Sequence, residues 1–301
     1  MELPEGRKAL PSHCIYMIKC DGAGNVQRFK ASLVCKGNHQ IEGIHYQATN
    51  APTARFGTVL LAFGITAKYD LEILQIDVCT AFLGVDMEEA NYVHMPQGYF
   101  CLLQTRGPYH DPSFTNTLQK MVLRLRKSFY GLKQSSHISY GRVKDIVITI
   151  GFVASHGDGG LFFLNDKDQG IVVTAVVVSV EDFLIIADHG SIGRIKDQIN
   201  RQFRMHDLRS FSLYLGMNVK HNWEHYTKDI HWHSNIPTIL AKFTVDESRP
   251  VGTPMAMQLH KRKPEDEACN SIIFQSMIGS LMYAITATQP DITCAIRVPC
   301  R

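Results

Sequence analysis

Two apolar, β-branched runs on either side of an acidic pair most constrain how this chain can fold. Residues 171–180 read IVVTAVVVSV and residues 183–187 read FLIIA, and both have the composition of buried β-strands. Glu181 and Asp182 lie between the two runs. The pattern predicts a β-hairpin that carries two carboxylates at its tip. The same acids argue against a membrane-spanning helix over residues 171–187.

Hydrophobic periodicity predicts an α+β fold for the rest of the chain. Ile192, Ile195, Ile199 and Phe203 follow at spacings of 3, 4 and 4, which form one face of an amphipathic helix. Strands and helices interleave without a regular βαβ rhythm, which favours α+β over a parallel α/β sheet. The other expected elements are a hairpin over about 14–33, a strand over 71–78, helices over 57–69, 140–150, 236–243 and 271–288, short strands up to about 233, and a loop over 100–118.

The composition is that of an ordinary intracellular protein with reduced thiols. The chain has 301 residues with 31 Lys and Arg against 28 Asp and Glu, so its net charge of +3 identifies no partner. This length fits two domains, or one domain built from subdomains. Eight cysteines include no C-x-x-C pair, which disfavours a disulfide framework or a zinc ribbon. Residues 1–12 carry two prolines and a glycine, which predicts a loose leader. Residues 1–10 lack the apolar core of a signal peptide, so we expect a cytoplasmic or nuclear location.

Three carboxylates stand where strands are expected to end. Asp77 closes the strand at 71–78, and Glu181 and Asp182 occupy the predicted hairpin tip. Neighbouring carboxylates repel one another unless a cation neutralises them, and Mg²⁺ prefers such oxygen ligands while leaving positions open for phosphates. The acids therefore suit metal-assisted phosphoryl transfer. The alternative is structural, because acids at strand ends and turns are common.

Basic and aromatic side chains gather in an acid-free stretch from Pro112 to Lys144. Phe129, Tyr130 and Tyr140 are interleaved with the bases. Such a mixture suits a groove that follows a phosphate backbone, and the alternative is a solvated surface. The bases of this stretch are Lys120, Arg124, Arg126, Lys127, Lys133, Arg142 and Lys144.

Histidines are abundant in one later segment, with five between residues 206 and 233. His231 and His233 would share one face of a strand, as a metal-binding pair does. No cysteine or carboxylate stands at convincing ligand spacing, so we favour a surface cluster. No Walker A, G-x-S-x-G or dinucleotide-binding motif is present.

A series of short strings, in a fixed order along the chain, carries a family resemblance. The strings are RFKASLVCKGNHQIEGIHY (28–46), APTAR (51–55), QIDVCTAFL (75–83), VHMPQGY (93–99), LRKSFYGLKQS (125–135), VEDFLII (180–186), YLGM (214–217), GSLMY (279–283) and PDI (290–292). Together they resemble the reverse transcriptase of copia-type (Ty/copia) LTR retrotransposons, from about residue 13 to 296. Each string alone is weak, whereas the ordered series is specific.

The resemblance implies a right-handed polymerase with fingers, palm and thumb, and a ferredoxin-like palm sheet. Residues 1–12 would be the leader, 13–260 the reverse transcriptase domain, and 261–301 a truncated connection segment. Within the domain, the fingers would cover about 13–75 and 87–150, the palm about 76–86 and 151–190, and the thumb about 191–260.

The resemblance also implies roles for individual residues. The catalytic acids, which would hold two Mg²⁺ ions with Mn²⁺ as a substitute, are Asp77, Glu181 and Asp182. The nucleotide-binding residues would be Lys30, Phe82, Gly131 and Gln134. The template–primer would be bound by Arg124, Arg126, Lys127, Tyr130 and Lys133.

Several departures from the family pattern fall on the functional strings, and two of them bear directly on catalysis. Ser179, Val180, Glu181 and Asp182 stand where the family has Tyr-Val-Asp-Asp, and Ser32 stands where it has an arginine. Glutamate places its carboxylate about 1.5 Å further from the backbone than aspartate, and a displacement near 1 Å can cost on the order of 100-fold in rate. Ser32 removes a cation that would stabilise charge on the transferring phosphate. We therefore expect impaired catalysis.

The predicted function is an RNA-directed DNA polymerase that uses an RNA or DNA template–primer and deoxynucleoside triphosphates. No membrane is expected as a partner, and a homodimer is a further possibility. The alternative interpretation is a non-catalytic, nucleic-acid-binding remnant of a decayed transposable element. It rests on the same basic stretch and the same substitutions.

Overall fold

The computed structural model describes most of the chain. Described are residues 1–20, 25–78, 81–96, 99, 121–164, 174–179, 182–202, 205–207, 211, 213–222, 224–225, 227–232, 235–255 and 270–298. The expected loop at 100–118, together with Lys120, Glu181 and His233, lies outside these residues.

A six-stranded sheet forms the centre of the molecule, in the order β11-β4-β10-β9-β8-β7. Each neighbouring pair in it runs antiparallel. The fold is therefore mixed α/β with an antiparallel core sheet, which agrees with the α+β prediction. Its strands are β4 (Glu72–Val78), β7 (Phe152–Ala154), β8 (Leu161–Leu164), β9 (Ala175–Ser179), β10 (Asp182–Ala187) and β11 (Met205–Asp207).

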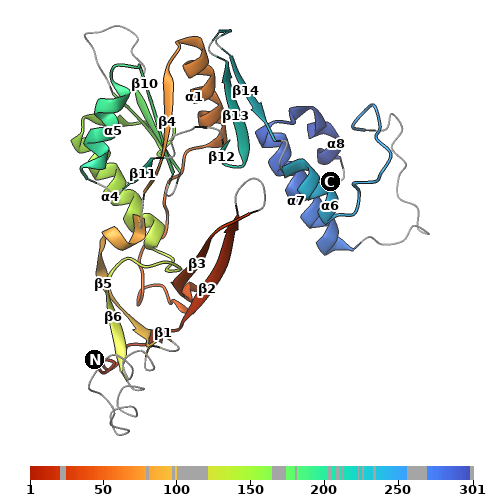
Figure 1. The fold of residues 1–301 in the computed structure, drawn as a ribbon. Coiled ribbons are helices and arrows are strands. Elements are labelled where there is room, and N and C mark those ends of the chain that lie inside the picture. The colour runs from red at the N-terminus through yellow and green to blue at the C-terminus, as the bar shows by residue number, and fades with distance from the viewer. Residues whose placement is uncertain are drawn as a thin grey trace.

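Helices cover both faces of this sheet (Figure 1). Helices α4 (Ser135–Thr149) and α5 (Ile192–Asn200) lie on one side, and α1 (Phe56–Lys68) lies on the other. Because both faces are buried, β9 and β10 are apolar at nearly every position, which is why they read as continuous hydrophobic runs.

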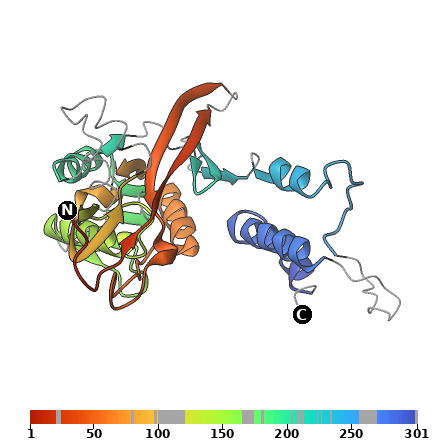
Figure 2. The same cartoon turned by 90° about the horizontal axis from the view of Figure 1, so that it is seen from below.

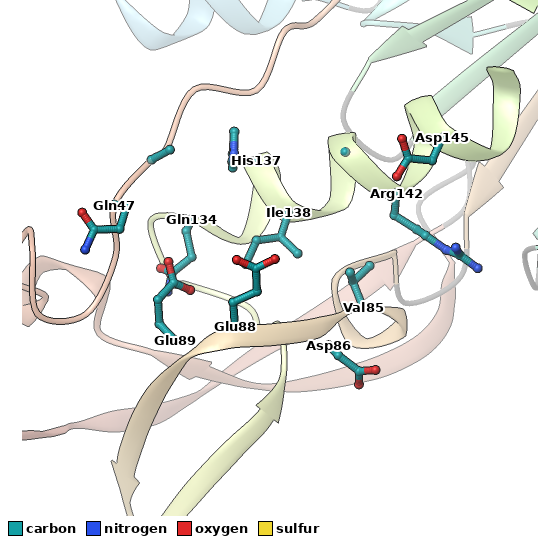
Figure 3. Close-up of a pocket in the computed structure, with 12 residues that line it drawn as sticks. Gln47, Val85, Asp86, Glu88, Glu89, Gln134, His137, Ile138, Arg142 and Asp145 are labelled. Carbon is teal, nitrogen blue, oxygen red and sulfur yellow. The ribbon is translucent and has the colours of Figure 1, made fainter.

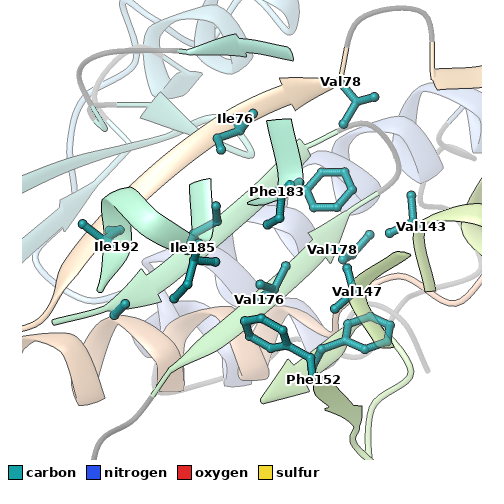
Figure 4. Packing of buried hydrophobic residues seen from close by; sticks show 14 residues of the cluster. Ile76, Val78, Val143, Val147, Phe152, Val176, Val178, Phe183, Ile185 and Ile192 are labelled. Carbon is teal, nitrogen blue, oxygen red and sulfur yellow. The ribbon is translucent and has the colours of Figure 1, made fainter. Parts of the chain in front are cut away.

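Strand alternation sorts the side chains of the central sheet into two cores. On β10, Phe183 and Ile185 join the core under α4 and α5 (Figure 4), whereas Leu184 and Ile186 join the core under α1. Asp182 shares the alternation phase of Leu184. It therefore belongs to the α1 side of the sheet.

Helix α1 begins at a cap supplied from a distant loop. The buried Asp158 carboxylate accepts hydrogen bonds from Arg55 N at 2.8 Å and from Thr58 Oγ1 at 2.5 Å. Its other oxygen accepts one from Gly160 N at 2.9 Å. The β7–β8 connection, which carries Asp158, is thereby tied to the entrance of α1.

Two further groups of strands lie outside the central sheet. Strands β1 (Ala9–Leu10), β5 (Asp86–His94) and β6 (Val122–Lys127) form one sheet, with β1 parallel to β5. Strands β2 (Ser12–Cys20) and β3 (Val26–Cys35) form the predicted hairpin, which projects as a long arm in both views (Figure 2).

Residues 1–12 are not a loose leader. Leu10 is 1% exposed and packs with Cys35 and Val93, and the Met1 amino group donates to Val122 O at 3.2 Å. The expectation was wrong because a strand of two residues leaves no periodic pattern in the sequence.

The last part of the chain contributes a small sheet and several helices. The sheet has the order β12-β13-β14, and its residue Tyr214 closes the core under α1. Helix α7 and the elements after it lie beyond this sheet, away from the central one (Figures 1 and 2). The elements are β12 (Leu213–Tyr214), β13 (Met217–Asn222), β14 (Thr227–His231), α6 (Asn235–Lys242), α7 (Ser271–Ala287) and α8 (Thr293–Arg297), with short 3-10 turns at Gly37–His39, Ala81–Gly84 and Pro290–Ile292.

Most of the long predicted elements are confirmed within a few residues. The largest difference is α4, which begins at Ser135 rather than near 140. None of the described helices is long and apolar enough to cross a membrane.

Candidate active site

Asp77 and Asp182 meet across two central strands. In the antiparallel pairing of β10 with β4, Asp182 stands directly opposite Asp77. Directly opposed residues share a face and have Cβ atoms about 4.5–5.5 Å apart, and both acids lie on the α1 side of the sheet. Two of the three predicted catalytic acids are thus brought together from positions about a hundred residues apart. Glu181, the third, is outside the described residues.

Among the described side chains, Gln75 is the hydrogen-bond donor to this pair. Burial raises the pKa of Asp182; the hydrogen bond from Gln75 lowers it, and the negative charge of Asp77 raises it further. Gln75 Nε2 donates to Asp182 Oδ1 at 3.4 Å, which is a long bond. Opposed, half-buried carboxylates with one weak donor form a set of hard oxygen ligands that fits a divalent cation. No cluster of three or more metal-binding side chains occurs within the described ranges.

Ser179 and Tyr214 adjoin these acids and were not predicted as site residues. Ser179 stands opposite Asp182 on the other side, in the β9–β10 pairing. The Tyr214 hydroxyl donates to Ser179 Oγ at 3.1 Å. Strand alternation from 175 to 179 could have placed Ser179 on this face. Nothing in the sequence indicates that Tyr214 reaches it, because that contact depends on how the small sheet packs.

Phe82 and Tyr130, two predicted site residues, are in contact. Phe82 lies in the short 3-10 turn after β4, and Tyr130 follows β6. Their rings meet edge to face at 5.1 Å between centroids and 88° between planes. This contact links the strand that carries Asp77 to the YGLKQ segment at 130–134.

The YGLKQ segment packs against the base of the β2–β3 arm. Cys35 N donates to Tyr130 O at 2.8 Å. Gly131 has φ +86 and approaches the Cys35 carbonyl so closely that a Cβ atom would collide with it. This is a left-handed conformation that glycine adopts without strain.

Gln134 is directed into a buried polar network. Its side chain is 1% exposed; Oε1 accepts from Gln40 Nε2 at 2.9 Å, and Nε2 donates to His45 O at 2.9 Å. Lys133 N in turn donates to Gln40 Oε1 at 2.7 Å. The Lys133 ammonium lies over the Tyr46 ring, 5.1 Å from its centroid. The amide of Gln134 thus holds together the 40–46 and 130–134 segments.

Lys30 lies on the arm, on a basic face. Met17 stands opposite Lys30 and Lys19 opposite Arg28, so Arg28, Lys30 and Lys19 share one side of the hairpin. Ser32, which stands where the family has arginine, continues the same face opposite Ile15. The other face is apolar and exposed, with Tyr16, Ile18 and Phe29 at 78%, 58% and 79% exposure.

The predicted template-binding bases of β6 are all exposed. Arg124 and Arg126 alternate onto one face of the strand, and Lys127 stands opposite Asp86 on β5. The two arginines form a positive strip that could lie along a phosphate backbone, whereas Lys127 lies on the opposite face of the strand.

A pocket of about 400 Å³ lies between β5 and α4 (Figure 3). Gln134 is the one predicted site residue in its lining. Four carboxylates against Arg142 and His137 give it an acidic wall, which would repel a triphosphate or a nucleic-acid backbone. We therefore separate it from the nucleotide site. Its acids are Asp86, Glu88, Glu89 and Asp145.

The fold and the paired acids characterise a mixed α/β protein with a candidate divalent-cation centre at one end of an antiparallel sheet. The chain belongs to the reverse transcriptase (RNA-dependent DNA polymerase) family, whose model matches residues 1–257. Its relatives are Pol polyproteins of transposons, which confirms the copia-type resemblance.

Relatives occur in two plants and a yeast. The chain is 29% identical to the retrovirus-related Pol polyprotein from transposon TNT 1-94 of Nicotiana tabacum, over 100% of this chain and 22% of the relative. It is 28% identical to the corresponding polyprotein from transposon RE2 of Arabidopsis thaliana, over 94% of this chain and 18% of the relative. A putative transposon Ty5-1 protein of Saccharomyces cerevisiae is 26% identical over 72% of this chain and 66% of its own length. The chain thus spans about a fifth of the length of the two plant polyproteins.

Among solved structures, a telomerase from Candida albicans, in complex with a fragment of telomeric RNA, matches 81% of this chain and 51% of its own. The sequence identity is 11% and the TM-score is 0.38, so this likeness is too low to add to the family assignment.

Proposed function

We propose that this reverse transcriptase domain extends a primer on an RNA or DNA template, using deoxynucleoside triphosphates and Mg²⁺, with Mn²⁺ as a substitute. The observation that carries the proposal is the direct opposition of Asp77 and Asp182 on one face of the central sheet. Membership of the family supports it, since reverse transcriptases generally use divalent metal ions.

Asp77, Glu181 and Asp182 would hold the cation. Once bound, Mg²⁺ would neutralise the transferring phosphate and favour ionisation of the primer 3′-hydroxyl. The role of the protein is to hold carboxylate oxygens in place before the substrate arrives, because preorganised charges need no rearrangement during the reaction. The rigid β4–β10 pairing suits this role.

The arm and the YGLKQ segment would form the nucleotide side of the site. Lys30 and its neighbours Arg28 and Lys19 offer cations to the triphosphate. Phe82 would lie against the sugar, held by its ring contact with Tyr130. The burial of Gln134 and the left-handed Gly131 suggest that these two residues fix the segment in position rather than touch the nucleotide.

The exposed bases Arg124, Arg126, Lys127 and Lys133 would bind the template–primer backbone. In this arrangement the central sheet, apart from β11 and the first residues of β4, serves as the palm, about 76–86 and 151–190. The arm with β5 and β6 serves as the fingers, about 13–75 and 87–150. The β12–β14 sheet and α6 would belong to the thumb, about 191–260. A homodimer stays a prediction.

Catalysis is expected to be weak for two separate reasons. Glu181 projects its carboxylate further than the aspartate of the family, and Ser32 leaves a gap in the basic face that Arg28 and Lys30 begin. The first change displaces a ligand, and the second removes a charge near the phosphate.

Primer extension with poly(rA)–oligo(dT) and dTTP tests the proposal. Slow extension that requires Mg²⁺ or Mn²⁺ and disappears in Asp77→Asn is expected. A chain that binds the hybrid and melts cooperatively, but shows no metal-dependent incorporation above the Asp77→Asn background, would contradict the proposal and support the non-catalytic alternative.

A further inference from the structure

A buried pair of hydroxyl groups adjoins the proposed metal centre. Tyr214 is 1% exposed and Ser179 is 8% exposed, and the Tyr214 hydroxyl donates to Ser179 Oγ at 3.1 Å. Ser179 stands directly opposite Asp182 in the β9–β10 pairing and shares its face of the sheet. A chain of polar groups thus runs from the small sheet to a candidate metal ligand.

The position of the Tyr214 hydroxyl is fixed by packing. Its ring meets Phe63 at 6.4 Å and 77°, and Phe211 at 6.1 Å and 45°. Burial raises the pKa of Tyr214 to about 12; the bond to Ser179 lowers it, and the charge of Asp182 raises it. The phenol therefore stays protonated and remains a donor at neutral pH.

The chemistry of a hydroxyl group decides where the Ser179 proton can go. A serine hydroxyl has one proton to donate and two lone pairs that accept. Because Tyr214 donates into one lone pair, the Ser179 proton must seek an acceptor elsewhere. The cross-strand neighbour on the same face is the carboxylate of Asp182, which accepts a long hydrogen bond from Gln75.

We propose that Ser179 and Tyr214 are positioning residues for the proposed metal centre: Tyr214 orients the Ser179 hydroxyl, and Ser179 donates its proton to the Asp182 carboxylate. The inference rests on the proposed function and deepens it. It also gives a role to the serine that stands where the family has tyrosine.

The test is Mn²⁺ binding to the purified full chain without nucleic acid, measured by the electron paramagnetic resonance signal of free Mn²⁺. Loss of a residue that orients a metal ligand typically weakens metal affinity about 10-fold or more. We expect a rise of roughly that size in the Mn²⁺ dissociation constant for both Tyr214→Phe and Ser179→Ala. Since the two hydroxyls act in series, the double variant should bind no more weakly than Ser179→Ala alone.

The matched control is Tyr283→Phe, which removes another hydroxyl bond to the small sheet, donated to Leu215 O at 2.7 Å. Its Mn²⁺ affinity should equal that of the wild type. Unchanged affinity in folded Ser179→Ala and Tyr214→Phe, or fully additive losses in the double variant, would overturn the inference. Failure of the folded wild type to bind Mn²⁺ would overturn the metal centre itself, and the positioning role with it.

Discussion

Asp182 lowers the folding stability of the metal-free protein at the proposed metal centre. A carboxylate that loses water and stands opposite Asp77 on the neighbouring strand is held in its charged form at a cost in free energy. The apolar residues that follow it, Phe183 to Ala187, are almost completely buried. They hold the acid in place in spite of the repulsion.

Asp182→Asn is expected to stabilise the metal-free protein at pH 7 by roughly 1 kcal/mol. The pKa of Asp182 is raised on folding, so the wild type loses stability as pH rises above the unfolded value near 3.8. The gain from the substitution should therefore be present at pH 7 and vanish below about pH 4. Thermal melting of wild type and variant across this range measures it.

The control for this prediction is Asp229→Asn, which changes an exposed acid on β14. It should alter the melting temperature little at any pH. Equal effects of the two substitutions would contradict the account of Asp182.

At this scale, part of the site could be predicted from the sequence. Asp77 and Asp182 end apolar strands, and alternation places them on one face. The burial of Gln134 could not be predicted, because a basic and aromatic string resembles a surface until Gln40 and His45 are brought to it. The Tyr214–Ser179 contact was likewise invisible in the sequence.

Among the elements, the turn at Gly131 joins two parts of the proposed nucleotide site. Its positive φ and its approach to the Cys35 carbonyl leave no room for a side chain. The position therefore requires glycine for two independent reasons.

Gly131→Ala should destabilise the protein by roughly 2 kcal/mol or more, from backbone strain plus the steric clash. Gly141→Ala is the matched control, because Gly141 lies within α4 and an added Cβ there meets nothing within 4 Å. That change should be neutral or stabilising by up to about 1 kcal/mol. Urea denaturation compares the two, and similar losses would refute the argument.

The cap of α1 gives a second prediction for an element. Burial raises the pKa of Asp158, but its hydrogen bonds with Thr58, Arg55 and Gly160 and the charge of Arg55 outweigh this and lower it overall. Asp158→Ala should cost roughly 2–3 kcal/mol at pH 7. A carboxyl group whose pKa is lowered by folding stabilises the folded state at pH values above its unfolded pKa. The stability advantage of the wild type over the variant should therefore shrink as pH falls below about 3.8. Chemical denaturation at pH 7 and pH 3 measures the stability difference between wild type and Asp158→Ala. An equal difference at the two pH values would contradict the role of Asp158 as the cap of α1.

Elements with strong periodicity were predictable, and short ones were not. Helix α5 follows from its isoleucine spacing, and the β9–β10 hairpin follows from its β-branched runs. Strand β1 could not be predicted from its sequence, because its two residues gain their structure only by pairing with β5. The early start of α4 was missed because polar Ser135 and Ser139 are buried there by tertiary contacts.

At the scale of the whole molecule, a near-neutral net charge hides separated regions of opposite sign. The arm and β6 carry exposed bases, whereas the β5–α4 pocket and the end of the central sheet carry acids. Nucleic acid is expected to bind along the arm and β6 and to avoid the acidic β5–α4 pocket.

Binding of an RNA–DNA hybrid should accordingly weaken with salt. Each phosphate contact adds roughly 0.7–0.9 to the slope of log affinity against log salt. Arg28→Ala with Lys30→Ala should lower that slope by about 1–2, whereas Lys68→Ala, at the end of α1, should leave it unchanged. Fluorescence anisotropy at several salt concentrations gives the slopes. An equal slope for the wild type, the Arg28→Ala/Lys30→Ala variant and Lys68→Ala would exclude the arm as a contact with nucleic acid.

Rescue of single-nucleotide incorporation measures how far Glu181 and Ser32 limit catalysis. Glu181→Asp with Ser32→Arg should raise the single-turnover rate on poly(rA)–oligo(dT) by on the order of 100-fold, and adding Asp77→Asn should abolish the gain. A wild-type rate already equal to that of the double variant, or no gain in a folded double variant, would contradict the account.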